Sequence, residues 1–387
     1  MSEAVIVAAG RSAIGRAFKG ALVGTRSDDL AAQVVNQVLA QVPELARSQI
    51  DDVICGCGLP GGEQGFNLGR VISLLAGVNA PGVTVARYCA SSLQAAAMAA
   101  HAVRAGEGEA FVVVGVECVS RFGYGMSDPP EAQNPRFAAG NPEGLPDVYI
   151  AMGETAENVA EREGVGRVEQ DEFALKSQRA AVAARADGFF EREIVGVELS
   201  GGGRFEADEG PRAGTSLEAL AALQPAFRAG GSVTAGNACP LNDGAACVIV
   251  MSLDAARRMG VRPLARIVST GVGALEPEFM GLGPVPATRQ ALARAGMNIS
   301  DIDVVEINEA FAAQVIPSAR ALGLDPMSPR LNPHGGAIAL GHPFGMTGAR
   351  ILCTLLNELA SLDLTVGLET MCVAGGQGMA MILERMA

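Results

Sequence analysis

The chain has few basic residues, and this shortage limits the partners that it can bind. Lys and Arg number 29 against 42 Asp and Glu, which gives a formal net charge of −13 at pH 7. A surface with this balance offers no broad positive field for nucleic acid or for an anionic membrane. We therefore expect neither as a partner, and any anionic ligand must be held by a few local donors.

Long apolar runs and patterned cysteines are also missing. No hydrophobic run reaches the length of a transmembrane helix, the first residues MSEAVIVAAGR lack the layout of a signal peptide, and the last residues ERMA form no targeting tripeptide. The eight cysteines lie mostly within apolar segments, without the spacing of a metal site or a disulfide framework. We expect a cytoplasmic protein with no bound metal.

The length and the apolar segments indicate an α/β protein with more than one core. A chain of 387 residues with 49% hydrophobic composition is long enough for two cores. Apolar runs at 4–9, 52–57 and 109–117 alternate with segments of helical periodicity. This order predicts a mainly parallel sheet that is covered on both faces.

The composition changes in the middle of the chain. Residues 120–240 hold most of the turn residues and charges, which suggests an excursion inserted into the first half, and such insertions often carry substrate recognition. From residue 244 the α/β alternation resumes. The elements expected there are strands at 264–269, 304–307, 364–372 and 379–383, helices at 288–295 and 310–322, and a long helical stretch at 336–359.

Cys89 is the first candidate for chemistry. A short β-prone run leads into VARYCASSLQA, where Cys89 stands just ahead of a helix-forming segment. The positive end of a helix dipole favours an anion, so this thiol is expected to lose its proton more easily than a free cysteine. Cys89 is therefore a candidate nucleophile. The alternative is a buried cysteine that packs as a small hydrophobic residue.

His342 is one of only three histidines, and it lies in NPHGGAIALGHPFGMTG. Pro343 fixes the backbone beside it, so the imidazole is a candidate base or hydrogen-bond donor with a pKa near neutrality. His101, on a helical run of alanines, and His334, in a loop, have less constrained surroundings.

Two further segments could complete a site. In MCVAGGQGM, Cys372 precedes small residues whose unhindered N–H groups suit an oxyanion site, although the segment could equally be a hairpin with a buried thiol. In NEAF, Asn308 lies at a strand-to-helix junction, where an ordinary helix cap is the simpler interpretation.

Taken together, five segments resemble the thiolase family in the family's own order. They are VARYCASSLQA, TAGNACPLNDGAA, EINEAF, GGAIALGHPFGMTG and CVAGGQG. The resemblance implies the thiolase fold, in which two βαβαβαββ halves form a five-layered α-β-α-β-α core. The halves would be residues 1–118 with 243–252, and 253–387, and a loop domain at 119–242 would cover the active site. It also implies a homodimer or a homotetramer.

The resemblance further implies acyl transfer through a thioester on Cys89. The thiol would attack the 3-keto carbon of a 3-oxoacyl-CoA, acetyl-CoA would leave, and free CoA would remove the shortened acyl group; the reverse reaction is a Claisen condensation. By the same resemblance, His342 takes the proton of Cys89 and Cys372 is the second base. CoA and acyl-CoA are substrates, and no bound cofactor is expected.

The resemblance assigns the binding groups as well. One oxyanion site would comprise His342 and a water held by Asn308, and the other the backbone N–H groups of Cys89 and Ala374. Ala374 stands where the family usually has Gly, and Cys239 with Pro240 replaces the usual Ser-Gly. The residues expected to contact substrate or CoA are Met152, Arg212, Ala238, Cys239 and Phe311.

Four functions remain open at this point. The leading one is a degradative 3-oxoacyl-CoA thiolase of fatty acid β-oxidation, because Ala151 occupies the place where acetoacetyl-specific members tend to have His. A biosynthetic acetoacetyl-CoA thiolase would use the same chemistry. A non-catalytic acyl-CoA-binding partner would not need Cys89, His342 and Cys372 together, and a condensing enzyme acting on carrier-protein thioesters would not supply Cys372.

Overall fold

The computed structural model describes residues 2–124, 129–137, 142 and 144–386. The strands of its main sheet are β1 Ala4–Arg11, β2 Gly15–Arg16, β3 Asp52–Gly56, β4 Gly82–Val85, β5 Ala110–Cys118, β8 Asn242–Ser252, β9 Ala265–Ala274, β10 Val304–Ile307, β11 Val366–Val373 and β12 Gln377–Arg385. The helices outside the segment between β5 and β8 are α1 Ser27–Leu39, α2 Leu68–Leu75, α3 Ser91–Ala105, α7 Leu253–Met259, α8 Pro284–Ala295, α9 Ala312–Ala321, α10 Ala337–Leu340 and α11 Thr347–Ser361.

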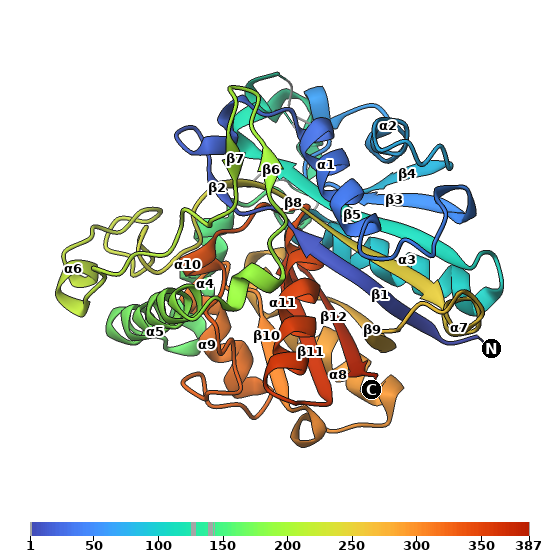
Figure 1. The fold of residues 1–387 in the computed structure, drawn as a ribbon. Coiled ribbons are helices and arrows are strands. Elements are labelled where there is room, and N and C mark those ends of the chain that lie inside the picture. The colour runs from blue at the N-terminus through green and yellow to red at the C-terminus, as the bar shows by residue number, and fades with distance from the viewer. Residues whose placement is uncertain (1, 125–128, 138–141, 143, 387) are drawn as a thin grey trace.

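The strands form two half-sheets, one from each half of the chain (Figure 1). The first has the order β4-β3-β5-β8-β1, with β2 paired to β8, and the second has the order β9-β12-β11-β10. Only two residue pairs, Val5 with Arg266 and Ile6 with Ala265, join β1 to β9. The expected repetition of strand and helix alternation in the second half of the chain is therefore present.

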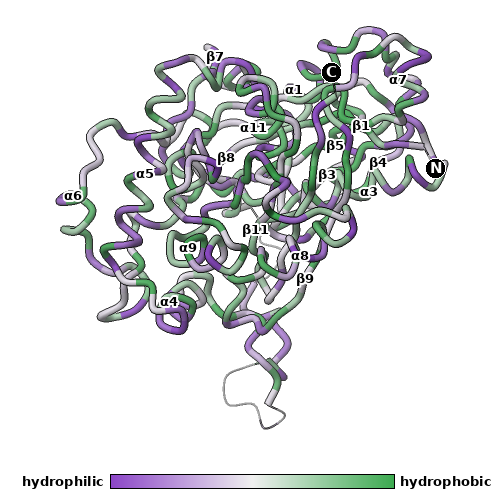
Figure 2. Tube along the Cα trace, turned by 90° about the horizontal axis from the view of Figure 1, so that it is seen from below, coloured by the Kyte–Doolittle hydropathy of each residue, from purple (hydrophilic) through white to green (hydrophobic). Residues whose placement is uncertain are grey.

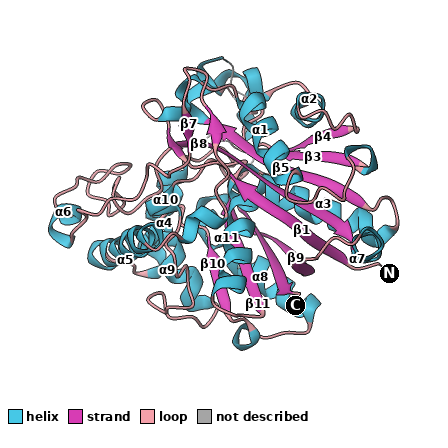
Figure 3. Ribbon diagram, viewed as in Figure 1, coloured by secondary structure: helices cyan, strands magenta, loops and turns pink. Residues whose placement is uncertain are grey.

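Helices lie on the outer faces of both half-sheets and also between them. Figure 3 shows the helices and the strands in different colours. One apolar cluster joins α1 and α2 to the outer face of the first half-sheet, and another joins α8 and α9 to the outer face of the second. Between the half-sheets, α3 and α11 pack against inward-facing residues of both. The expected five-layered α-β-α-β-α core of the thiolase fold is confirmed.

Hydrophobic burial holds these layers together. All nine residues of β5 and all eleven of β8 are buried, and Figure 2 shows long hydrophobic stretches along the central strands. Each fully buried Val, Ile, Leu or Met side chain contributes about 1.5 to 3 kcal/mol relative to an exposed one. Strands that are apolar on both faces are stable only between two helical layers, so this pattern accounts for the layering.

The expectation of a mainly parallel sheet is wrong, because the sheet is mixed. Parallel pairs occur only between β3 and its neighbours β4 and β5, and between β10 and β11, among the strands described. The short turn at 374–376 between β11 and β12 leaves no room for a crossover, so these strands pair antiparallel. β8 is likewise antiparallel to β5 and β1.

Between β5 and β8 the chain leaves the sheet. This excursion contains α4 Met152–Glu163, α5 Arg167–Ala186, α6 Leu217–Ala221 and a small hairpin of β6 Val197–Glu198 and β7 Arg204–Phe205. In Figure 1, α5 and α6 project to one side of the half-sheets, and α4 and α5 contact α9. No described helix is long and apolar enough to cross a membrane.

The expected long helix at 336–359 is interrupted. α10 ends at Leu340, Gly341 adopts φ 115°, and α11 begins only at Thr347. A φ of this sign favours glycine, and Pro343 lacks the N–H that a continuous helix would need. The break leaves His342 in an irregular segment that turns its side chain toward the end of β10.

Candidate active site

Cys89 lies in a tight turn that precedes α3. The turn is a single 3₁₀ segment, Tyr88–Ala90, in which Tyr88 has φ 42°. Ser91 holds this conformation, because its Oγ accepts from Arg87 N–H at 2.9 Å and donates to the Tyr88 carbonyl at 2.6 Å. Left-handed backbone is unfavourable for a side chain as large as tyrosine, so the surrounding structure must impose it. The result is a fixed position for Cys89 at the start of the helix.

The half-buried Cys89 side chain faces a pocket of about 280 Å³. The residues that line this pocket are Leu59, Tyr88, Cys89, Gln133, Val148, Tyr149, Ile150, Met152, Phe344 and Ala374. The excursion supplies five of these residues, from Gln133 to Met152, and Cys89 and Ala374 come from the turn before α3 and the turn between β11 and β12. Thus residues from both half-sheets and the excursion meet around one sulfur atom.

The expectation that Cys89 loses its proton easily is wrong for the protein without substrate. Burial raises the pKa of the Cys89 thiol to about 12, and the nearby charge of Glu117 adds to the rise. The backbone N–H groups of Cys89 and Ala374 act against this, because they hydrogen-bond the sulfur and stabilise the thiolate. Desolvation outweighs both donors, so Cys89 is a protonated thiol at neutral pH.

His342 is fixed by hydrogen bonds at its backbone and its ring. Its N–H donates to Asn242 Oδ1 at 3.0 Å, and its Nδ1 lies 2.6 Å from Thr347 Oγ1. The Thr347 hydroxyl donates to the Pro343 carbonyl at 2.8 Å, so the ring must donate from Nδ1 to Thr347. This tautomer leaves Nε2 as a proton acceptor. Burial and then the positive charge of Arg350 lower the pKa of His342 to about 3, so the ring is neutral.

Asn308 lies beside that acceptor. Its side-chain Nδ2 is 3.4 Å from His342 Nε2, and its backbone N–H donates to the Thr370 carbonyl at 3.0 Å. Asn308 Oδ1 is buried and has no partner among the described residues. The side chain therefore has a free acceptor next to the imidazole, which the helix-cap interpretation does not explain.

Cys372 and Cys239 complete a group of three thiols. Burial raises the pKa of Cys372 well above its ordinary value, and the charges of Cys89 and Cys239 raise it further, so the three sulfurs are neighbours. Cys372 also packs in one apolar cluster with Ala238 and Phe311, against which Met152 and Cys239 lie.

The segment around Cys239 is aligned by backbone pairing. Ala238 forms an antiparallel bridge with Phe311, and Cys239 N–H donates to the Ala310 carbonyl at 2.9 Å. Nine of the ten predicted site residues thus lie in two adjoining groups. One group is Cys89, Met152, Ala238, Cys239, Phe311, Cys372 and the backbone of Ala374. The other is Asn308 with His342, which Thr347 ties to α11, and α11 contacts the Cys89 turn.

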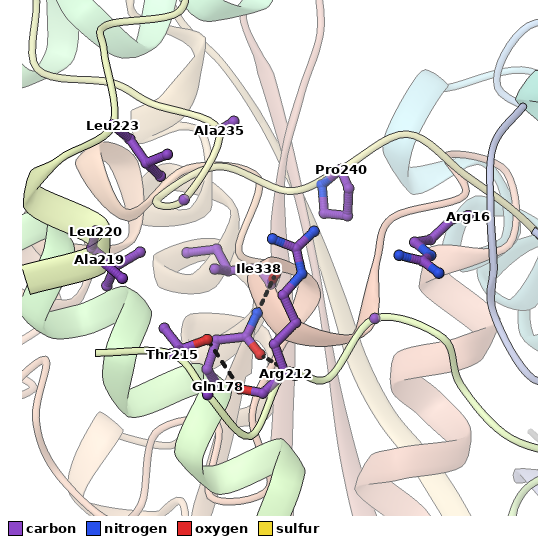
Figure 4. A pocket seen from close by; sticks show the side chains of 13 residues that line it. Arg16, Gln178, Arg212, Thr215, Ala219, Leu220, Leu223, Ala235, Pro240 and Ile338 are labelled. Carbon is purple, nitrogen blue, oxygen red and sulfur yellow. Dashed lines mark hydrogen bonds between the residues drawn. The ribbon is translucent and has the colours of Figure 1, made fainter. Parts of the chain in front are cut away.

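Arg212 lies apart from them, in a second pocket of about 260 Å³ (Figure 4). Its backbone N–H donates to Gln178 Oε1 at 2.9 Å, and in Figure 4 its side chain extends toward Pro240. Ala235 and Pro240 also line this pocket. Because Cys239 precedes Pro240, one segment borders both the Arg212 pocket and the thiol group.

Sequence reasoning missed several residues of the site. Thr347 and Asn242 fix His342, while Val148, Ile150 and Phe344 line the Cys89 pocket. Thr347 had a usable signal, since it follows His342 by five residues at the start of a helix. The pocket residues had none, because apolar side chains in irregular segments look the same whether they face the core or a ligand. Among the described residues, no three His, Cys, Asp or Glu side chains could hold a metal ion.

The chain is similar to known proteins over its whole length. Residues 4–254 match the family described as thiolase, N-terminal domain, and residues 261–385 match thiolase, C-terminal domain. A beta-ketoadipyl-CoA thiolase of Escherichia coli is 44% identical over 401 aligned positions, and a 3-ketoacyl-CoA thiolase of Aeromonas hydrophila is 43% identical over 393, each alignment covering 100% of both chains.

A solved structure agrees. The crystal structure of the Bacillus anthracis acetyl-CoA acetyltransferase matches with a TM-score of 0.90 at 38% identity, covering 100% of this chain and 99% of that one. The sequence comparisons and the structural comparison therefore both match thiolases over both halves of the chain. The chain belongs to the thiolase family of enzymes.

Proposed function

We propose that this enzyme cleaves 3-oxoacyl-CoA with CoA, giving acetyl-CoA and an acyl-CoA shortened by two carbons. The observation that carries the proposal is that Cys89, which lines a pocket of about 280 Å³, has Cys372 as a neighbouring thiol. His342 is held by Thr347 at the start of α11, the helix that contacts the Cys89 turn. A fold that only bound acyl-CoA would have no need for two thiols and a neutral imidazole at one place.

The first half of the reaction forms a thioester on Cys89. His342 Nε2 accepts the thiol proton while the sulfur attacks the 3-keto carbon of the substrate. The bond between C2 and C3 then breaks, its electron pair stays on the acetyl-CoA fragment as an enolate, and the thiol of Cys372 protonates C2. Acetyl-CoA leaves, and the remaining acyl group is bonded to Cys89.

The second half transfers the acyl group to CoA. The Cys372 thiolate takes the proton of the incoming CoA thiol, the CoA sulfur attacks the thioester, and Cys89 leaves with the proton held by His342. Two donors, the N–H groups of Cys89 and Ala374, already hydrogen-bond the Cys89 sulfur and are available for a developing oxyanion. Asn308, through a water at its unpartnered Oδ1, would serve with His342 at the other oxyanion.

The pockets support a longer, uncharged acyl chain. Val148, Ile150, Met152 and Phe344 give the Cys89 pocket an apolar wall. We assign CoA to the segment that runs from Cys239 to the Arg212 pocket. A degradative thiolase is therefore our first choice, and an acetoacetyl-CoA-specific enzyme is the second, since the similar Bacillus anthracis protein is named acetyl-CoA acetyltransferase.

We also propose that the enzyme is a homo-oligomer. Strand β4 ends the sheet order, and all four of its residues are partly exposed. Phe66 and Leu74, which precede β4, are 95% and 54% exposed. An exposed edge strand with apolar neighbours is normally covered in solution. Light scattering of the purified enzyme tests this, and a monomer at micromolar concentration would exclude it.

Replacement of Cys89 tests the proposed reaction. Cys89→Ala should abolish thiolysis of 3-oxooctanoyl-CoA and also the acyl adduct that mass spectrometry detects on the peptide containing residue 89. Cys239→Ser is the matched control, because it replaces a neighbouring thiol by the hydroxyl that the family usually has there, so a contact to CoA is kept, and it should retain most of the activity. Full turnover by Cys89→Ala would eliminate the thioester mechanism, and an inactive wild-type enzyme would favour the acyl-CoA-binding alternative.

A further inference from the structure

Glu117, near the end of β5, is a buried carboxylate that the reaction steps do not use. Its side chain is fully buried, and it is the only charged residue in this strand. An ionised carboxylate is costly to bury unless hydrogen bonds satisfy it, so the partners of Glu117 indicate what the residue does.

The two oxygens of Glu117 accept N–H groups from segments that are far apart in the sequence. Oε2 accepts from the backbone of Gly58 at 2.7 Å and of Gly345 at 2.9 Å. Oε1 accepts from the side-chain amide of Gln64 at 2.7 Å and from the Leu59 N–H at 3.3 Å. One carboxylate therefore joins the segment after β3 to the segment between α10 and α11.

Gly58 brings this junction against the turn that holds Cys89. A Cβ atom at position 58 would lie 2.7 Å from Glu117 Oε2, 2.8 Å from Phe344 Cβ and 3.3 Å from the Tyr88 carbonyl oxygen. Contacts this short leave room only for glycine. Glu117 is thus located where the segment after β3, the segment before α11 and the turn before α3 meet.

The segments that Glu117 joins also form adjoining parts of the Cys89 pocket. Leu59 and Phe344 both line that pocket and are half-buried, whereas Glu117 is not among its described lining residues. The Leu59 N–H is itself bonded to Glu117, and Phe344 directly precedes the bonded Gly345. Glu117 therefore holds two pocket side chains in place from outside the pocket lining.

An ionised carboxylate fits these partners, and an amide does not. Each oxygen of Glu117 accepts from two N–H groups, so a glutamine here would turn its own NH₂ group toward two donors. Gln64 cannot turn away to relieve this, because its Oε1 accepts from the Cys118 N–H at 2.6 Å. Burial raises the pKa of Glu117, and the four N–H groups oppose that rise.

We propose that Glu117 is a positioning residue that sets the acyl-chain specificity of the enzyme by holding Leu59 and Phe344 as one rigid wall of the Cys89 pocket. The proposal rests on the proposed function, in which the acyl chain of 3-oxoacyl-CoA lies in this pocket. A longer acyl chain buries more apolar surface against the wall than acetoacetyl-CoA does, so loss of the wall's fixed position should affect the longer chain more.

The test compares Glu117→Gln with the wild type in the thiolysis of 3-oxooctanoyl-CoA and acetoacetyl-CoA. The ratio of kcat/KM for the longer substrate to kcat/KM for the shorter one should fall about tenfold or more in the variant, the effect of losing the contacts of one methylene group. The loss should be mainly in the KM of the longer substrate, because the wall contributes to binding and takes no part in the chemical steps.

Two further variants separate the wall from a general loosening of the fold. Leu59→Ala removes a wall side chain and should lower the same ratio. Asp303→Asn is the matched control, since Asp303 Oδ2 accepts from the backbone N–H groups of Thr365 and Val366 at 3.0 and 2.8 Å. These groups lie at the start of β11, at the opposite end of the strand from Cys372, so the ratio should stay unchanged.

An unchanged ratio in Glu117→Gln or in Leu59→Ala would overturn the proposal, and so would equal losses for both substrates, which a structural role alone would produce. If Glu117→Gln does not fold, Leu59→Ala and hydrogen exchange of the wild type decide. The amides of Gly58, Leu59 and Gly345 should exchange slowly because a buried carboxylate holds them, and rapid exchange would refute that role. A wild type that is inactive with both substrates would instead refute the proposed function itself.

Discussion

The side-chain nitrogen of Asn308 lies 3.4 Å from Nε2 of His342, the atom that we assign as proton acceptor. Asn308→Ala would remove this neighbour and the water site at Oδ1. We predict that kcat falls about 100-fold to 1000-fold, the usual cost of one oxyanion donor, with little change in KM. Steady-state thiolysis measures both constants. Asn158→Ala, at an exposed hydrogen bond to the Glu278 carbonyl, is the control and should leave kcat unchanged; an equal loss in both variants would contradict the assignment.

Thr347 determines which nitrogen of His342 is free. Thr347→Val keeps the shape of the side chain but removes the acceptor 2.6 Å from Nδ1, so the ring can adopt the wrong tautomer or rotate. We predict a fall in kcat of about 10-fold to 100-fold, as for other residues that orient a functional histidine. Thr347→Ser retains the hydroxyl and should stay within about twofold of the wild type by the same reasoning. If Val and Ser variants have equal rates, the hydroxyl has no such role.

The lining of the Cys89 pocket predicts that the enzyme distinguishes substrates by the charge at the end of the acyl chain. None of its described lining residues is basic, whereas 3-oxoadipyl-CoA ends in a carboxylate. We predict that kcat/KM for 3-oxohexanoyl-CoA exceeds that for 3-oxoadipyl-CoA by about 100-fold or more, because burying an unpaired carboxylate costs several kcal/mol. The two substrates have the same chain length, so only the terminal charge differs.

Met152→Arg provides the reverse test of this pocket. Met152 lines the pocket at the start of α4, and a guanidinium there could pair with the terminal carboxylate. The preference for 3-oxohexanoyl-CoA should shrink by about tenfold, the effect of about 1.4 kcal/mol. Equal kcat/KM values for the two substrates in the wild type would refute the prediction and suggest a substrate like that of the beta-ketoadipyl-CoA thiolases.

Local sequence patterns predicted the helices, the strands and the motif residues. They could not predict features that depend on segments far apart in the chain, such as burial and strand register. The apolar run before Glu117 and the helix after Cys89 were readable because hydrophobic periodicity is local. The protonated state of Cys89 was not, because it depends on burial by segments far away in the chain. Glu306 and Glu369 each look like a single acidic residue in an apolar strand, and only the β10–β11 register places them side by side.

Fold stability should depend strongly on Arg11. Its guanidinium is fully buried between Glu193 and Asp208, and breaking a buried ion pair by removing one partner leaves two unpaired carboxylates. We predict that Arg11→Met lowers the free energy of unfolding by about 3 to 5 kcal/mol in urea titration. Arg26→Met is the control, because the half-exposed Arg26 pairs with Asp28 and Glu63 at the surface, where loss of a pair costs about 0 to 1 kcal/mol.

The neutral state of His342 should also make the fold sensitive to acid. Its pKa is lowered from 6.5 to about 3, so between these values the unfolded chain binds a proton that the folded protein does not. Stability from this group is therefore complete above pH 6.5 and is lost as the pH falls toward 3. From pH 6.5 to pH 5 the loss is about 2 kcal/mol, at about 1.36 kcal/mol per pH unit.

His342→Gln removes this contribution and keeps a polar side chain of similar size. Urea unfolding of both proteins at pH 7 and pH 5 measures it, and the wild type should lose about 2 kcal/mol more than the variant on acidification. The raised pKa values of Glu306, Glu358 and Glu369 act in the opposite direction, since protonated buried carboxyls favour the folded state at lower pH, but they contribute to both proteins and cancel in the difference. Parallel losses in the two proteins would mean that His342 is protonated to the same extent before and after unfolding, and it could not then be the neutral base that accepts the Cys89 proton.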